Sequence, residues 1–334
     1  MSRPQILQLY REELERGLAE ALRADEARDG SLLYPILRYH VGLRDEKGLE
    51  EKALGKMLRP SLLLFITQEL GGDVERALPA AISLELVHNF SLIHDDIQDH
   101  DEIRRGRSTV WKLIGVAQAI NAGDLMYSLA IKHALLSGPS AAGSIIDAAT
   151  AMIEGQALDL AFEDRWVDTE SYISMIDKKT GALIRCAFST AGIISGADDD
   201  TLDVLASLGR DLGRAFQITD DLLGVWGNGD VTGKPRGSDI RRKKKSFPVA
   251  LTMQRADEEG RTLLKRVYAQ DEITDNDVAR VVALMVRLDV RKSGEEAVEE
   301  HLKQASASLE YLPLSKEGKE MMRELIAYLA RREK

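Results

Sequence analysis

Apolar residues recur along most of this chain at intervals of three and four, the spacing that gives a helix one apolar face. Close to the N-terminus, Ile6, Leu9 and Tyr10 begin such a face. The same pattern predicts further helices over residues 60–70, 77–100, 114–137, 140–164, 169–194, 201–224, 246–256, 275–309 and 316–332. Strand-like alternation of apolar and polar residues is hardly seen. The sequence therefore predicts an all-α fold.

The chain has no internal repeat, low-complexity tract or long Pro/Gly/Ser linker, so a single domain over residues 1–334 is expected. A length of 334 residues with a hydrophobic content of 44% allows a sizeable core. The most irregular segment runs from Gly227 to Ser246 and is rich in Gly, Lys and Arg. It is predicted to be a mobile loop that closes over an anion.

Charge and cysteine content narrow the classes of function. A net charge of -10 argues against general affinity for nucleic acid or for anionic membrane surfaces. Cys186 is the single cysteine, so no internal disulfide forms and a cytoplasmic location is expected. The segment from Met1 to Arg23 has the pattern of a charged amphipathic helix without a signal-peptide core. No run of about 18 apolar residues occurs, so no integral membrane segment is expected.

Two aspartate-rich segments lie within otherwise apolar stretches. The first contains Asp95, Asp96 and Asp99, and the second contains Asp220 and Asp221. Burial of an unpaired carboxylate is costly, so several together require cations, and oxygen-only ligands suit Mg²⁺. Either segment alone could equally be the solvated end of an acidic helix. Two of them in apolar surroundings indicate a site for metal ions and diphosphate.

The first segment continues a polar stripe along one predicted helix. At about 100° per residue, His88, Ser91, Asp95 and Asp99 fall on one face, while the surrounding positions are apolar nearly all round. Such a helix is expected to be buried, with its polar stripe lining an internal cavity. Asp95 and Asp99 could then share metal ions.

Cationic residues accompany both acidic segments, as a diphosphate ligand would require. Arg104 and Arg105 follow the first segment, and Lys56 and Arg59 lie in a Gly-Lys-x-x-Arg-Pro turn. Guanidinium groups bind phosphate oxygens in a two-pronged manner. The alternative for Arg104 and Arg105 is a helix C-terminus stabilised by its dipole by about 0.3–1 kcal/mol. The 178–179 lysine pair and Lys234 leave the same choice open.

In their order over about residues 50–250, the spaced polar motifs resemble those of the trans-type isoprenyl diphosphate synthases, also called polyprenyl synthetases. The motifs are Gly-Lys-x-x-Arg-Pro, Leu92-Ile93-His94-Asp95-Asp96-x-x-Asp99, Arg104-Arg105-Gly106, Lys179-Thr180-Gly181, Phe216-Gln217-x-x-Asp220-Asp221, Gly233-Lys234 and Gly237-x-Asp239. Each is weak by itself, but chance does not readily produce so many in this order.

The resemblance implies a single large helical bundle around a deep central pocket, usually in a homodimer, with the two acidic helix ends facing each other across its mouth. Three Mg²⁺ ions would lie there. Asp95 and Asp99 resemble ligands of two ions and Asp220 of the third, and Asp96 and Asp221 complete the candidate metal set.

The substrates that the resemblance implies are an allylic diphosphate and isopentenyl diphosphate. The allylic diphosphate would contact Arg104, Lys179 and Lys234, with Lys244 as a candidate to close over it. The residues similar to an isopentenyl diphosphate site are Lys56, Arg59, His88 and Arg105. Metals and fixed cations would disperse the charge of the leaving diphosphate. The allylic cation would be attacked by the isopentenyl double bond and then lose a proton, with Thr180, Gln217 and Phe216 near the reacting carbons.

Product length is predicted from the residues that precede Asp95. Ser91 is small and leaves room for a growing tail, whereas Phe90 resembles the family's bulky floor residue. The expected product is geranylgeranyl diphosphate (C20), with farnesyl diphosphate (C15) second. The chain departs from the commonest family pattern at Leu54 and Met57, at Gly224, where many members have an Asp, and around Asp230.

Four alternatives remain beside this interpretation. Glu85-x-x-His88 matches half of a di-iron bundle site, but no second copy is visible. The basic run 241–245 could bind nucleic acid, although a solvated loop suits a net acidic chain better. A terpene cyclase or lyase would need both acidic segments but no isopentenyl diphosphate site. A non-catalytic subunit of a synthase would need no metal ligands.

Overall fold

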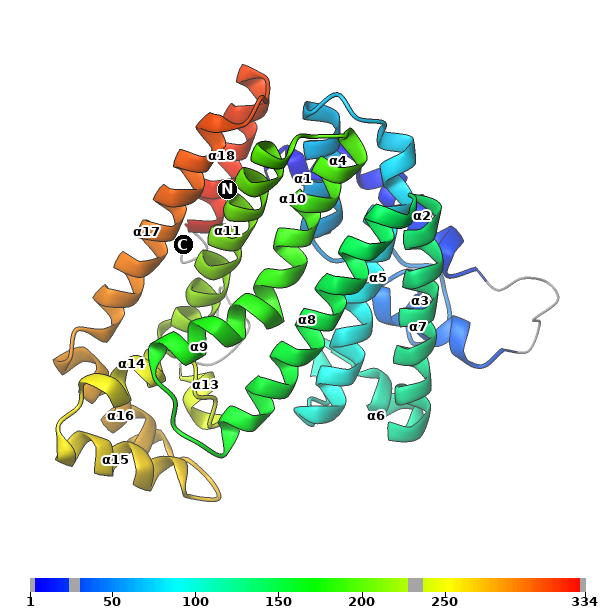
Figure 1. The fold of residues 1–334 in the computed structure, drawn as a ribbon. Helices are drawn as coiled ribbons and strands as arrows, with labels where there is room; N and C mark the ends of the chain where they lie inside the picture. Colours follow the sequence, from blue (N-terminus) through cyan, green and yellow to red (C-terminus); the bar gives the residue numbers. More distant parts are fainter. Residues whose placement is uncertain (1–3, 24–30, 228–236, 331–334) are drawn as a thin grey trace. The chain divides into compact units, whose positions relative to one another are not determined.

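The computed structural model describes residues 4–23, 31–227 and 237–330 (Figure 1). The described residues are mostly helical, with one short two-stranded hairpin. The predicted all-α fold is therefore confirmed. In these ranges no helix has the length and low polarity needed to cross a membrane.

The chain folds as two compact units. Unit 1 comprises residues 1–149, 186–205 and 313–321, and unit 2 comprises residues 150–185, 206–312 and 322–334. This division does not test whether either unit folds alone, so the single domain stays a prediction.

The described part of unit 1 contains the helices α1 (Ile6–Leu9), α2 (Arg11–Ala21), α3 (Leu33–Val41), α4 (Leu58–Glu69), α5 (Val74–Gln98), α6 (Val110–Ile114) and α7 (Val116–Leu136). The hairpin strands β1 (Ile103–Arg104) and β2 (Arg107–Ser108) lie between α5 and α6 in the sequence. Unit 2 contains α9 (Thr169–Ile176), a π-turn (Asp177–Gly181), α13 (Ser238–Arg241), α14 (Phe247–Arg255), α15 (Glu258–Tyr268), α16 (Asp275–Arg287) and α17 (Val290–Tyr311). Residues of both units occur in α8 (Pro139–Glu163), α10 (Ala182–Ser195), α11 (Asp199–Trp226) and α18 (Lys316–Ala330).

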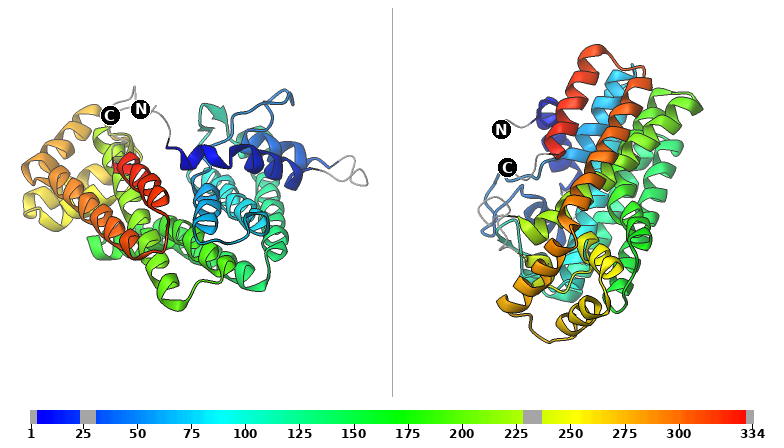
Figure 2. Two further views of the ribbon diagram at one scale, coloured as in Figure 1. Left: turned by 90° about the horizontal axis from the view of Figure 1, so that it is seen from above. Right: turned by 90° about the vertical axis from the view of Figure 1, so that its left-hand side faces the viewer.

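Helix α5 is the centre of unit 1. It packs against α4 and α7 (Figure 2), and apolar residues cover most of its circumference, which explains why it is buried along most of its length. Its first turn is capped by Asp73, whose carboxylate accepts hydrogen bonds from the backbone N–H groups of Glu75 and Arg76. The polar stripe of this helix is thus carried by a rigid, buried element.

A proline within α5 is accommodated by a serine from the end of α7. Pro79 has no N–H and disturbs the hydrogen-bond ladder of the preceding turn. The Ser137 hydroxyl accepts from the backbone N–H of Ala80 at 2.9 Å and donates to the carbonyl of Arg76 at 2.8 Å. One hydroxyl therefore bridges the donor and the acceptor that an unbroken helix would have joined directly.

In unit 2, two glycines let helices approach the π-turn closely. A Cβ atom at Gly155 of α8 would lie 2.3 Å from the backbone nitrogen of Lys179. A Cβ atom at Gly213 of α11 would lie 2.8 Å from the Cα of Gly181. Any side chain at either position would displace the turn, so glycine is required by close packing.

The helix boundaries differ from the prediction in several places. The predicted helix 275–309 is divided between α16 and α17, because Asp289 adopts a left-handed backbone conformation with φ 52°. The predicted helix 169–194 contains the π-turn. Helices α3, α6 and α15 and the hairpin were not predicted.

The irregular segment from Gly227 to Ser246 is described only in part. Lys234 and Asp230 lie outside the described residues. From Gly237 onward, the segment forms the short helix α13 and a turn in which Lys244 is exposed. Its predicted closing motion stays a prediction.

Candidate active site

The first acidic segment forms the end of α5. Asp95 and Asp99 are partly exposed there, whereas Asp96 is 1% exposed. The hairpin that follows brings Arg104 back to the helix, and its Nε donates to Asp96 Oδ1 at 2.7 Å. Burial raises the pKa of Asp96 to about 6, against the opposing effect of Arg104. Within this segment, Asp96 is held by the protein, and Asp95 and Asp99 lie nearer the surface.

In the second acidic segment, one aspartate is again buried and its neighbour exposed. Asp220 is exposed, whereas Asp221 is 4% exposed. Asp221 Oδ2 accepts from the Tyr172 hydroxyl at 2.6 Å and from the backbone N–H of Phe247 at 3.0 Å. Its Oδ1 accepts from Gln217 Nε2 at 2.9 Å. Burial raises the pKa of Asp221 to about 7, although these donors favour the ionised form.

The structure explains why a glycine fits at position 224, where the sequence departs from the common family pattern. A Cβ atom at this position would lie 2.0 Å from Asp239 Oδ2. The carboxylate of Asp239, from α13, therefore lies directly against the α11 backbone where many family members have an aspartate of their own. Only glycine leaves room for it.

A cationic cluster surrounds His88. Burial lowers the pKa of His88 well below its ordinary value, and Arg59 and Arg105 lower it further. Gly55 allows this arrangement, because a Cβ atom there would lie 2.9 Å from Arg105 Nη1. The structure thus brings together three of the four residues predicted to bind isopentenyl diphosphate. The fourth, Lys56, has an exposed side chain in the loop before α4.

Glu85 lies beside this cluster rather than in a di-iron arrangement. Asn89 Nδ2 donates to Glu85 Oε1 at 3.0 Å, and burial raises the pKa of Glu85 while Arg59 lowers it. Over the described ranges, no three or more His, Cys, Asp or Glu side chains gather closely enough to hold a metal ion by themselves.

The π-turn carries Lys179 and Thr180. Lys179 Nζ forms an ion pair with Asp159 Oδ2 of α8 at 2.5 Å. The Thr180 hydroxyl donates to Gln217 Oε1 at 2.6 Å, and Gln217 in turn donates to Asp221. Three predicted site residues of unit 2 therefore form one hydrogen-bonded chain that ends on the second acidic segment.

The two residues predicted to set product length lie on different parts of the α5 surface. Phe90 is 5% exposed, and its ring centroid lies 4.7 Å from that of Tyr127 and 5.8 Å from that of His94. Ser91 is partly exposed, and its hydroxyl donates to the carbonyl of His88. Phe90 is therefore wedged between α5 and α7.

Sequence reasoning missed the partners that anchor the acidic segments. Tyr172 and the backbone of Phe247 reach Asp221 across sequence separations of 49 and 26 residues, which no local pattern reveals. In the basic run, Lys245, which was not among the predicted site residues, has contacts to α8 and to the residues that follow it. It donates to the carbonyls of Glu163 and Arg165.

The donor set fits hard cations. Asp95, Asp99 and Asp220 offer carboxylate oxygens near the surface, and oxygen ligands suit Mg²⁺ better than softer metals. Asp96 and Asp221 are already engaged by protein donors, and whether they also bind metal stays a prediction.

Comparison with known proteins agrees with these features. The family model described as polyprenyl synthetase matches residues 50–285. The (2E,6E)-farnesyl diphosphate synthase of Mycobacterium tuberculosis is 41% identical over 261 residues, covering 75% of this chain and 72% of that protein. The geranylgeranyl diphosphate synthase of Saccharolobus solfataricus is 41% identical over 235 residues, covering 68% of this chain and 71% of that protein.

A solved structure gives the same result. The polyprenyl synthetase from Streptomyces coelicolor A3(2) superposes with a TM-score of 0.87 at 33% sequence identity, covering 97% of this chain and 98% of that one. The chain belongs to the polyprenyl synthetase family. It is a prenyltransferase, and the predicted reaction class is confirmed.

The surroundings of His40 can be tested through the pH dependence of stability, because this residue lies near Arg104 and Arg105. This α3 residue lines a cavity of about 70 Å³ with Asp96, Arg104 and Arg105, and its Nε2 is buried. Burial lowers the pKa of His40 to about 3, with Arg104 and Arg105 contributing.

Because the folded-state pKa is below the ordinary value of about 6.5, the unfolded chain binds the extra proton first on acidification. Stability should therefore be full above about pH 6.5 and fall toward pH 3, by at most about 1.4 kcal/mol per pH unit for this group. Urea unfolding from pH 7 to 4 should show a smaller loss of stability for His40→Gln than for the unaltered protein. Parallel curves for the two proteins would contradict this assignment.

Proposed function

We propose that this enzyme condenses isopentenyl diphosphate with an allylic diphosphate. The observation that carries this proposal is the presence of two arginines, Arg59 and Arg105, near His88 on the helix that carries the first acidic segment. A terpene cyclase or lyase, the alternative on this fold, ionises one diphosphate and has no use for a second diphosphate site. A non-catalytic subunit would have no use for either.

Within the proposed site, His88 acts as a neutral group. Its pKa is lowered by burial and by three nearby arginines, so near neutral pH it donates an N–H hydrogen bond instead of carrying a charge. Arg59 and Arg105, together with Lys56, supply the positive charge for the diphosphate of isopentenyl diphosphate.

We assign metal binding to Asp95, Asp99 and Asp220, with Asp239 as a further carboxylate beside the second segment. Bound Mg²⁺ ions would neutralise charge on the leaving diphosphate. Asp96 and Asp221 would act mainly as anchors, because protein donors already occupy them. The number of three ions stays a prediction.

The remaining roles concern the allylic diphosphate. Arg104 and Lys179 would hold its oxygens, and Lys234 would join them from outside the described residues. Thr180 and Gln217 would lie near the reacting carbons, where their mutual hydrogen bond fixes both side chains. No side-chain base is required if the departing diphosphate takes the proton.

For product length we propose geranylgeranyl diphosphate, with farnesyl diphosphate second. The relatives quoted above carry both names at the same identity, so overall similarity does not separate them. The supporting feature is Phe90, whose buried ring would limit the space for the growing chain.

We also propose a homodimer. Helix α7 exposes several large apolar side chains, and an exposed apolar helix face is typical of a protein interface. Val116, Ile120 and Leu135 lie within about 100° of one another around the helix, whereas Leu136 faces away from Val116. The cytoplasmic location stays a prediction.

Replacement of Asp95 tests the metal assignment. Asp95→Ala should reduce condensation by about 10²–10³-fold or more, because charge on the leaving diphosphate would lose stabilisation. Incorporation of labelled isopentenyl diphosphate and circular dichroism should be measured together. Helix content should stay unchanged, and the exposed acid Glu102, replaced in Glu102→Gln, is the matched control. Full activity of Asp95→Ala would refute the assigned site.

Replacement of Phe90 tests the floor of the pocket. Phe90→Ala should shift the product distribution to longer chains, because removal of the ring opens space. The cost in stability should be about 3–5 kcal/mol. Phe188→Ala removes an equally buried ring elsewhere and should not alter chain length. An unchanged product distribution in Phe90→Ala, measured by chromatography of dephosphorylated products, would exclude Phe90 as the stop.

A charge on the exposed face of α7 tests the dimer. Ile120→Asp should dissociate it, as measured by sedimentation velocity, since a carboxylate would be buried without a partner. Val286→Asp is the control, because Val286 is 60% exposed on α16, outside the proposed interface, compared with 43% for Ile120. A monomeric unaltered protein, or a dimer that persists in Ile120→Asp, would contradict the proposal.

A further inference from the structure

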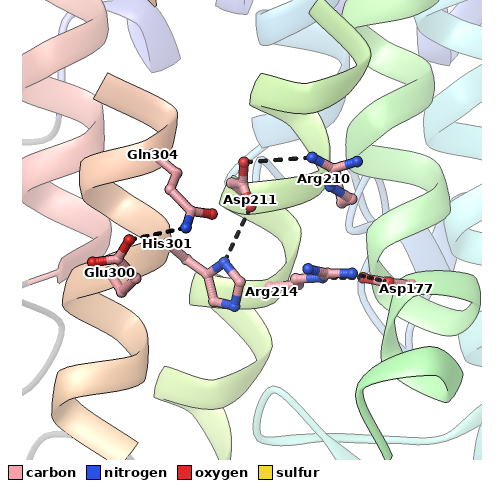
Figure 3. Close-up of polar contacts among 7 residues, drawn as sticks. All are labelled: Asp177, Arg210, Asp211, Arg214, Glu300, His301 and Gln304. Carbon is pink, nitrogen blue, oxygen red and sulfur yellow. Dashed lines mark hydrogen bonds and ion pairs between the residues drawn. The ribbon is translucent and has the colours of Figure 1, made fainter. Parts of the chain in front are cut away.

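An ion pair in unit 2 lies outside every role assigned so far. Arg214 of α11 faces Asp177, the first residue of the π-turn (Figure 3). Arg214 Nε donates to Asp177 Oδ1 at 2.7 Å, and Nη2 donates to Oδ2 at 2.5 Å. Both side chains are about one quarter exposed. This two-pronged geometry fixes direction as well as distance.

The ion pair connects the turn to α11, and so does the hydrogen bond from Thr180 to Gln217. Asp177 and Thr180 are three residues apart on the turn, and their partners Arg214 and Gln217 are three residues apart on α11. The two contacts therefore have the same spacing on both elements. Next to these contacts the two backbones approach closely, at Gly213 of α11 and Gly181 of the turn.

A second acidic side chain, Asp211, also favours the charged form of Arg214 and raises its pKa. Asp211 is 3% exposed and lies three residues before Arg214 on the same helix. His301 Nδ1 of α17 lies 3.1 Å from Asp211 Oδ1 (Figure 3), and the Asp211 charge, in addition to Asp177, stabilises the Arg214 cation. Arg214 therefore contacts the Asp177 carboxylate and is also stabilised by the charge of Asp211, which is itself paired with His301 of α17.

A π-helical turn with i→i+5 hydrogen bonds is rare, usually interrupts an α-helix for a single turn, and is frequent at functional sites. The π-turn also determines the direction of the Lys179 and Thr180 side chains. A relaxation to regular α-helix would rotate both side chains relative to α11 and break the contact with Gln217.

We propose that Arg214 and Asp177 are positioning residues that hold the π-turn in register, so that Lys179 and Thr180 meet the allylic diphosphate. Neither member of the pair touches substrate. The inference rests on the proposed function of Lys179 and Thr180 and adds the device that orients them.

The kinetic test compares Arg214→Gln, Asp177→Asn and the double variant. Each single change should raise KM for the allylic diphosphate by about 10-fold and leave KM for isopentenyl diphosphate unchanged. The double variant should be no worse than either single one, because both remove the same interaction. Arg214→Lys, which keeps the charge, should recover part of the loss.

The control is Arg291→Gln, which removes an exposed ion pair within α17 and should leave both constants unchanged. Equal increases in both KM values, or no change in either, would overturn the positioning role in an enzyme that condenses the two substrates.

Hydrogen–deuterium exchange supplies a readout that does not depend on activity. In the free protein without metal or substrate, amides of residues 177–181 should exchange faster in Arg214→Gln, with α5 unaffected. Unchanged exchange in the turn would overturn the inference. If the unaltered protein fails to condense its substrates, the proposed function fails, and the exchange result still decides whether the pair holds the turn.

Discussion

The site depends on the burial of one carboxylate in each aspartate pair. Asp96 and Asp221 are almost completely buried in apolar helices, where an ionised carboxylate without donors would cost several kcal/mol. Each carboxylate therefore accepts a hydrogen bond from a segment elsewhere in its unit. Arg104 comes from the hairpin after α5, and Tyr172 comes from α9. These contacts fix the helix end, and the preceding aspartate is left facing outward.

The same constraint explains why elements that look like connections are ordered. The hairpin of β1 and β2 has only two residues per strand, and its own ladder contributes little. Its position is set by the Arg104 ion pair with Asp96 and by Arg107, which donates to the carbonyl of Arg44. In unit 2, the start of α14 is held in the same way, because the Phe247 N–H donates to Asp221. The contacts that stabilise the two buried carboxylates therefore also hold the hairpin and the start of α14 in place.

The sequence predicted most of the long helices and located the two aspartate-rich segments on them, because both depend on short-range spacing. It missed features that depend on distant partners or on backbone conformation. The π-turn adds a single residue to a helix whose apolar pattern continues on both sides, so periodicity over 169–194 gave no sign of it. The break at Asp289 requires a left-handed residue that is not glycine, and Tyr172 is 49 residues from the carboxylate it binds. Helix α15 is short and rich in charged residues, which hid its narrow apolar face.

The central claim is the condensation itself. The most direct measurement incubates the purified protein with Mg²⁺, labelled isopentenyl diphosphate and, in separate reactions, C5, C10 and C15 allylic diphosphates, followed by chromatography of the products. Incorporation of isopentenyl units with a dominant C20 product is the expected result. Absence of incorporation with every primer would contradict the assignment of the cationic cluster around His88 as an isopentenyl diphosphate site.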